Sequence, residues 1–134
     1  MAGRASGAFF LLIAAQAAHS AEEYLFRLYD RFAPARAASE ALGPLGLERP
    51  AGFLAVNAAL ILFGLWCWLA RVRPARGAWR GLAWFWILLE AANAIGHFAL
   101  AALAGGYFPG VATAPLLLAA ALWLAVRLRP NEGT

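Results

Sequence analysis

Four apolar stretches follow one another along the chain, and each is about long enough to cross a bilayer as a helix. They cover residues 7–26, 50–69, 79–103 and 109–126. A helix needs about 20 mainly apolar residues to cross the hydrocarbon core. The pattern therefore predicts an all-α, polytopic membrane protein built as a four-transmembrane-helix bundle. Pro50 suits the first turn of the second helix, whereas Pro115 is predicted to kink the fourth.

The composition is that of a membrane protein rather than of a soluble domain. Hydrophobic residues make up 63% of the 134 residues and charged residues 13%, whereas soluble domains average roughly 45–50% apolar and about 25% charged. We expect a single membrane domain over residues 1–134. Every basic side chain is an arginine, and these arginines flank the apolar stretches. The net charge of +4 therefore points to lipid headgroups and topology, and not to nucleic acid.

The distribution of arginines predicts the orientation of the helices. One set of helix ends carries Arg4, Arg71, Arg73, Arg76, Arg80, Arg127 and Arg129. The other set carries Arg27, Arg31, Arg36 and Arg49, diluted by Asp30, Glu40 and Glu48. Because cytoplasmic loops carry the excess of arginine, both termini are expected in the cytoplasm, with the protein in a bacterial-type inner membrane. The connection over residues 30–49 is expected to lie as a short amphipathic helix over the outer mouth of the bundle.

The first 20 residues also resemble a secretory signal. Arg4 precedes an apolar run, and Ala18-His19-Ser20 before Ala21 is close to a small-x-small cleavage site. Cleavage there would remove His19 and leave three helices. The apolar stretch continues past this point to Phe26, which favours an uncleaved helix.

Five ionisable side chains lie inside two of the predicted helices. The first helix holds His19, Glu22 and Glu23, and the third holds Glu90 and His97. An ionised side chain at bilayer depth costs roughly 2.5 kcal/mol or more, so such residues mark functional sites. Residues three and four apart share a helix face, so each group forms one stripe that should face the bundle interior. Since both helices run outward, we expect Glu90 nearest to His19 and His97 nearest to Glu22 or Glu23.

Several uncharged residues belong to the same picture. Asn93 stacks with Glu90 and His97, and Asn57 is a single amide on the second helix with Asn93 as its expected partner. Tyr107 follows two glycines and indicates a turn with an interfacial aromatic anchor, from which its hydroxyl can donate a hydrogen bond to the site. The single cysteine, Cys67, is expected to be an inert buried residue.

Three kinds of chemistry fit this set of residues. Imidazole and carboxylate groups suit a divalent metal such as zinc, iron or manganese, and helical bundles hold metals with His and Glu spaced three apart. Alternatively, Glu22 and Glu23 share one proton and act in metal-free acid–base catalysis. Chains of Glu and His also line proton or ion pathways. A purely structural His–Glu contact between helices is the remaining reading, and it contributes only about 0.6 kcal/mol.

The motif His19-Ser20-Ala21-Glu22-Glu23 resembles the signature of the HXXEE-domain family of small integral membrane proteins. That family is described by an HXXEE motif, a further histidine and a YXPG motif. His97 and Tyr107-Phe108-Pro109-Gly110 match the second and third elements in order, so the resemblance covers residues 16–110. It implies that Pro109 and Gly110 matter as well, and it supplies no activity.

These residues favour an integral membrane enzyme, a hydrolase or isomerase, acting on a lipid or isoprenoid-like substrate. The expected catalytic positions are Glu22, Glu23, Glu90, Asn93 and Tyr107. The expected metal ligands are His19, Glu22, Glu23, Glu90 and His97. The expected partners are membrane lipids and a lipophilic small molecule, with a homo-oligomer left open. The alternatives are a subunit of a proton-coupled small transporter or channel, and a structural or assembly protein that would tolerate Gln in place of its buried glutamates.

Overall fold

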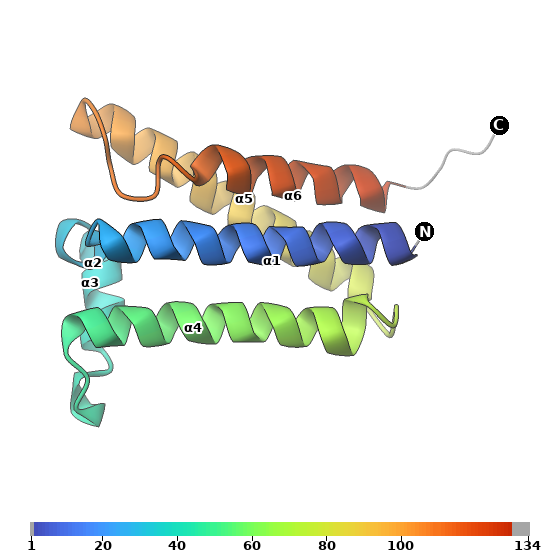
Figure 1. Ribbon diagram of the computed structural model, residues 1–134, viewed down its shortest axis with the longest axis horizontal. Coiled ribbons are helices and arrows are strands. Elements are labelled where there is room, and N and C mark those ends of the chain that lie inside the picture. Colours follow the sequence, from blue (N-terminus) through green and yellow to red (C-terminus); the bar gives the residue numbers. More distant parts are fainter. Residues whose placement is uncertain (1, 130–134) are drawn as a thin grey trace.

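The computed structural model describes residues 2–129, which form a purely helical fold (Figure 1). Its six α-helices are α1 (Ala2–Leu25), α2 (Leu28–Arg31), α3 (Ala33–Glu40), α4 (Arg49–Cys67), α5 (Trp79–Ala104) and α6 (Ala114–Leu128). A 3₁₀ turn, η1 (Gly43–Leu45), precedes α4, and a π-helical segment, η2 (Trp68–Val72), continues it. Residues 2–129 contain no β-strand, so the all-α prediction is confirmed.

Two helices are long and apolar enough to cross a membrane. The helix formed by α4 and η2 (Arg49–Val72) has 24 residues and a mean hydropathy of 2.1, and α5 has 26 residues and a mean hydropathy of 1.6. In contrast, α6 has only 15 residues. The 24 residues of α1 include the polar site residues, which lower its hydropathy. Length and composition alone therefore identify two candidate spans.

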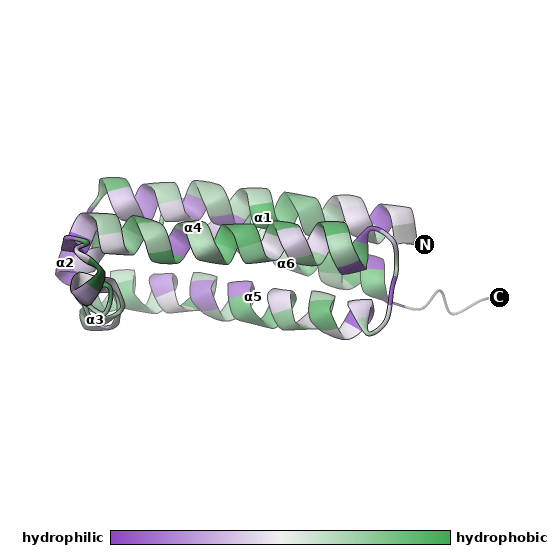
Figure 2. Ribbon diagram, turned by 90° about the horizontal axis from the view of Figure 1, so that it is seen from below, coloured by the Kyte–Doolittle hydropathy of each residue, from purple (hydrophilic) through white to green (hydrophobic). Residues whose placement is uncertain are grey.

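The long helices pack around α1. One side of α1 packs against α4 and another against α6, while α5 packs mainly against α6 and touches α4 at η2. In Figure 1, α1 and α5 run in one direction and α4 and α6 in the other. Figure 2 shows α5 as a separate layer beside the other three helices. The parallel course of α1 and α5 brings the C-terminal halves of these two helices, with their histidines, to the same end of the bundle.

The predicted start of the fourth helix at residue 109 was wrong. α5 ends at Ala104, where Gly105 adopts the left-handed conformation with φ of 67°, and α6 begins only at Ala114. The intervening residues form a loop that ends in a run of turns over residues 109–113. Pro115 therefore lies in the first turn of α6, where its missing N–H is tolerated, and produces no kink.

The connection between α1 and α4 contains short helices, as expected, and it is fastened by ion pairs. The Arg49 guanidinium lies 2.9 Å from Asp30 Oδ1 and 2.6 Å from Glu40 Oε1. The hydrogen bond from Arg49 holds the pKa of Asp30 below its usual range. α3 packs closely on α4 because Gly52 has no side chain: a Cβ atom there would collide with the carbonyl group of Ser39.

The end of the bundle opposite this connection has an apolar core. Phe9, Leu12, Ile13, Trp86 and Leu124 are each at most 2% exposed. They come from α1, α5 and α6, so they fill the space between the two layers. Burial of such side chains contributes roughly 1.5–3 kcal/mol each in water; within a bilayer, close packing of this kind holds the helices together.

We predict that Gly52→Ala lowers the thermal stability of the protein in detergent, because the new methyl group separates α3 from α4. Overpacking of this kind costs about 1–3 kcal/mol. Gly81→Ala is the matched control, since a Cβ at this helical glycine meets nothing within 4 Å. Equal melting temperatures for the two variants would contradict the close approach of α3 to α4.

Candidate functional site

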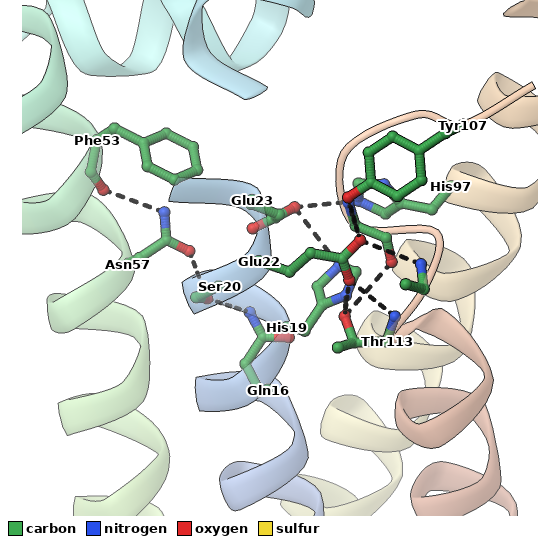
Figure 3. Close-up of polar contacts among 12 residues, drawn as sticks. Gln16, His19, Ser20, Glu22, Glu23, Phe53, Asn57, His97, Tyr107 and Thr113 are labelled. Carbon is green, nitrogen blue, oxygen red and sulfur yellow. Dashed lines mark hydrogen bonds and ion pairs between the residues drawn. The ribbon is translucent and has the colours of Figure 1, made fainter. Parts of the chain in front are cut away.

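Glu22 joins α1 to the loop between α5 and α6 through five hydrogen bonds (Figure 3). Its Oε1 accepts from the Tyr107 hydroxyl at 2.6 Å and from the backbone N–H groups of Gly110 and Ala112 at 3.1 Å each. Its Oε2 accepts from the backbone N–H of Thr113 at 2.8 Å and from the Thr113 hydroxyl at 2.6 Å. A carboxylate offers about four lone-pair positions. Both oxygens of Glu22 are therefore fully engaged by the loop.

The Tyr107 side chain is 46% exposed to solvent, and Ala112, another of these donors, is also an exposed residue. Partial burial, together with the hydrogen bond to the Glu22 carboxylate, raises the pKa of Tyr107 to about 12. The phenol is thus neutral at physiological pH and remains a donor. Its hydroxyl binds Glu22, and Tyr107 is not one of the three residues of the buried cluster described next.

Glu23 faces the two histidines instead. Its Oε1 lies 3.0 Å from His97 Nε2 and 3.5 Å from His19 Nε2. The imidazole rings meet edge to face, with centroids 4.6 Å apart. All three side chains are buried, and their ligand atoms lie within 4.8 Å of one another. The expectation that His97 lies beside Glu22 or Glu23 is confirmed, with Glu23 as the partner. We call these three residues the His–Glu–His cluster.

Thr113 determines which nitrogen of His19 carries the proton. His19 Nδ1 lies 2.8 Å from Thr113 Oγ1. The Thr113 hydroxyl has a single proton, and the Glu22 carboxylate at 2.6 Å is a far better acceptor than the carbonyl of Gly110 at 3.4 Å. Nδ1 of His19 must therefore donate to Thr113. In the neutral ring, Nε2 then carries the lone pair, and it has no hydrogen-bond partner within residues 2–129.

Gly110 provides the space that the two imidazoles occupy. A Cβ atom at this position would collide with the His97 ring and would lie 2.9 Å from Cε1 of His19. Its φ of 96° is also in the left-handed region that favours glycine. Within the Tyr-x-Pro-Gly motif, Tyr107 thus binds Glu22, whereas Gly110 leaves room for the two histidine rings.

The geometry reduces the five expected metal ligands to three. Glu22 is committed to the loop, and Glu90 is not among the residues whose ligand atoms lie within 4.8 Å of one another. Glu90 is 1% exposed, and neither of its oxygens has a hydrogen-bond partner within the described part of the chain. Of the five expected ligands, the structure therefore brings together the three of the His–Glu–His cluster, whose atoms could hold a metal ion.

A second polar network links α1 to α4. Gln16 Nε2 donates to Ser20 Oγ at 3.1 Å, and Ser20 donates to Asn57 Oδ1 at 2.7 Å. Asn57 in turn donates to the carbonyl of Phe53 at 3.0 Å (Figure 3). Asn57 therefore binds Ser20 on α1 and its own helix rather than Asn93, the partner that the sequence offered, although both asparagines line the cavity described next.

A cavity of about 220 Å³ lies beside the cluster. Its polar lining is Gln16, Glu23, Asn57, Asn93 and His97, together with Ser39. Apolar side chains of the connection and of α4 complete its wall: Leu28, Phe32, Ala35, Ala38, Phe53, Val56 and Leu60. Asn93 faces this space, as expected for a residue on the stripe with His97. The cavity therefore brings carboxylate, imidazole and amide groups to one space beside the residues of α2 and α3.

The cluster fits a metal ion by its chemistry and by its spacing. With bonds of about 2.0–2.1 Å, two ligands of a tetrahedral zinc ion lie about 3.3 Å apart. Glu23 Oε1 lies 3.0 Å from His97 Nε2 and 3.5 Å from His19 Nε2, and all three ligand atoms lie within 4.8 Å of one another. Two histidines and one glutamate also form a known catalytic zinc set, with a fourth position left open. His19 has the supporting hydrogen bond that metal-bound histidines usually make, through Thr113, whereas Nδ1 of His97 has none within residues 2–129.

Ser20 and Thr113 are the site residues that the sequence patterns did not single out. Ser20 lies inside the His-x-x-Glu-Glu motif, so its position carried a signal. Thr113 lies 94 residues from His19 and in no motif, so only the folded structure identifies it.

The chain matches a protein-family model over most of its length. A family model described as a protein of unknown function with HXXEE motif matches residues 10–124. This range includes all residues of the cluster and of the loop that Glu22 binds. No curated protein and no solved structure matches the chain.

We predict that Glu22→Gln destabilises the protein, because the new NH₂ group faces N–H donors that have lost their acceptor. A lost hydrogen bond to a charged group costs about 1.5–3 kcal/mol. Thermal unfolding in detergent measures the effect. Glu48→Gln, which removes an exposed carboxylate that makes no ion pair within residues 2–129, is the control. If both variants melt like the parent protein, Glu22 does not hold the loop.

We predict that His19 is the Nδ1–H tautomer and that Thr113→Val abolishes this preference, since valine keeps the shape but not the hydroxyl. Thr113→Ser should preserve it. The ¹⁵N chemical shifts of selectively labelled histidine report the tautomer directly. An Nε2–H tautomer in the parent protein, or identical spectra for the Val and Ser variants, would rule out the hydrogen bonds from His19 to Thr113 and from Thr113 to Glu22.

Proposed function

The chain belongs to the HXXEE family, whose function is unknown, and from this premise we propose that it is a metal-dependent enzyme embedded in a membrane. One observation carries the proposal. Two imidazoles and one carboxylate are buried with their ligand atoms within 4.8 Å of one another, and two of the three residues line a cavity. Such a buried set is costly unless the groups are used.

The proposed metal ligands are Nε2 of His19, Oε1 of Glu23 and Nε2 of His97. A divalent ion such as zinc, iron or manganese would supply a Lewis acid at this position. The chain itself performs the remaining tasks. Thr113 keeps the lone pair of His19 on Nε2, and the amides of Asn57 and Asn93 line the space where a polar group of the substrate would bind. Lewis-acid chemistry of this kind suits a hydrolase or an isomerase.

The size of the cavity favours an amphiphilic substrate. Complete small-molecule ligands usually occupy pockets of about 300–1,000 Å³, whereas this cavity measures about 220 Å³. It accommodates the polar or reactive end of a molecule but not a long chain. α4 touches α5 mainly at η2, at the far end of the bundle. We therefore propose that the apolar part of a lipid or isoprenoid-like substrate lies between α4 and α5.

We further propose that four helices cross the membrane, with α1 and α6 added to the two candidate spans. α1 has the required length, and it packs between α4 and α6. The loop after α5 supplements the short α6. Seven arginines lie at the end of the bundle opposite the cluster. By the arginine rule this end is cytoplasmic, which puts both termini on the inner side of a bacterial-type inner membrane and the cluster in the outer half of the bilayer.

The apolar core argues against a transport pathway. Phe9, Leu12, Ile13 and Trp86 are buried between the cluster and the arginine-rich end. A path for protons or ions needs polar groups or water along its length. Within residues 2–129 these apolar side chains separate the polar cavity from the arginine-rich end, which favours an enzyme site over a transport path.

We predict that the protein, purified in detergent without chelator, contains nearly one equivalent of zinc, iron or manganese by ICP-MS. His19→Ala and His97→Ala should each lower the metal content at least tenfold, because each removes one of three ligands. Glu90→Gln is the matched control and should keep the metal, since Glu90 lies outside the cluster. A metal-free parent protein, or an unchanged content in both histidine variants, would contradict the proposal.

A further inference from the structure

A long groove runs along the face where α1 and α6 meet, remote from the cluster. Its wider part, of about 680 Å³, is lined near the arginine-rich end by Gly3, Arg4, Gly7 and Ala8 of α1 and by Arg127 of α6. Its narrower part, of about 320 Å³, is lined by Ala14 and Ala15 and by Leu116, Ala119 and Ala120. Leu11 and Trp123 line both parts, so the two hollows adjoin each other at these two side chains.

The sequence explains why this face is hollowed. Glycine or alanine occupies the facing positions of both helices, at the i, i+3 and i+4 spacing that keeps residues on one face. Where such small residues meet, either another helix approaches closely or a slender apolar ligand fills the space. The narrower part is almost wholly apolar, whereas the wider part carries two guanidinium groups.

Two arginines make the wider end of the groove positively charged. The guanidinium of Arg127 lies 5.7 Å from the centre of the Trp123 ring, a cation–π contact that positions it at the rim. Arg4 lines the same hollow from α1. Neither arginine forms an ion pair with a residue in the range 2–129. An anionic group bound here would therefore meet two guanidinium groups that are available to pair with it.

The length of the groove matches one leaflet. Twelve residues separate Gly3 from Ala15, which corresponds to about 18 Å along a helix. Half of a hydrocarbon core is about 15 Å thick. A groove that starts at the arginine-rich end and stops near the bilayer centre has the dimensions of a single acyl chain with its headgroup.

We propose that this groove is a binding site for an anionic phospholipid of the leaflet at the arginine-rich end. The lipid phosphate binds Arg4 and Arg127, Trp123 packs beside the glycerol region, and one acyl chain lies along the alanines of α1 and α6. This site is independent of the His–Glu–His cluster and of the proposed enzymatic function, but it rests on the proposed placement of α1 and α6 in the membrane.

A second copy of the chain is the competing occupant, because small residues also favour contacts between helices. Charge disfavours it. In a symmetric dimer the same patch occurs on both subunits, so Arg4 and Arg127 of one copy would face those of the other across the contact. An anionic lipid neutralises the same two charges.

Native mass spectrometry of the protein released from nanodiscs tests the proposal. The probes are phosphatidylglycerol and phosphatidylcholine with identical acyl chains. We expect the parent protein to retain phosphatidylglycerol preferentially, and Arg4→Gln with Arg127→Gln to weaken its binding about fivefold for each arginine removed. Ala119→Phe, which fills the apolar part at an exposed position, should weaken it without changing the charge. Arg71→Gln with Arg76→Gln is the control, with the same loss of charge at the same end of the bundle outside the groove.

Three results would overturn the proposal. The first is equal retention of the two lipids by the parent protein. The second is the same loss in the control variant, which would show a diffuse effect of surface charge. The third is a dimer that Ala119→Phe dissociates, which would identify a second copy of the chain as the occupant.

Discussion

The hydrogen bonds between Glu22 and the loop after α5 are the interaction on which the site depends. The Glu22 carboxylate is only 7% exposed, and an ionised carboxylate so buried costs several kcal/mol unless its lone pairs are satisfied. Five donors from residues 107–113 provide this compensation. Two of them are backbone N–H groups just before α6, at the positive end of the helix dipole. The same bonds place Gly110 over the imidazoles and Thr113 beside His19.

This interaction gives the family motif a physical interpretation. Glu22 and Glu23 are adjacent, so they project about 100° apart around α1 and meet different surroundings. Glu22 faces the loop, whose donors bind both of its carboxylate oxygens. Glu23 lies one turn from His19 and faces His97. The tyrosine and glycine of the later motif complete the arrangement. The tyrosine donates a hydrogen bond to Glu22, and the glycine has no side chain that would collide with the two imidazole rings. The motif elements are thus distant in sequence but form one connected unit.

The sequence predicted those features that depend on periodicity. The all-α fold, the parallel course of α1 and α5, and the meeting of His97 with Glu23 follow from apolar stretches and helical spacing. Periodicity did not predict the start of α6, because the loop before it is folded so that its backbone N–H groups bind Glu22. The partner of Asn57 and the role of Thr113 depend on which helices pack together, which local patterns do not encode. For the same reason the sequence could not separate the two adjacent glutamates.

The central claim is that His19, Glu23 and His97 together hold one metal ion. X-ray absorption spectroscopy of the protein loaded with one equivalent of zinc tests it most directly. The account predicts a first shell of nitrogen and oxygen at about 2.0–2.1 Å, with the outer-shell scattering of two imidazole rings. A shell that contains sulfur, or one without imidazole scattering, would contradict it, because the ion would then be bound elsewhere.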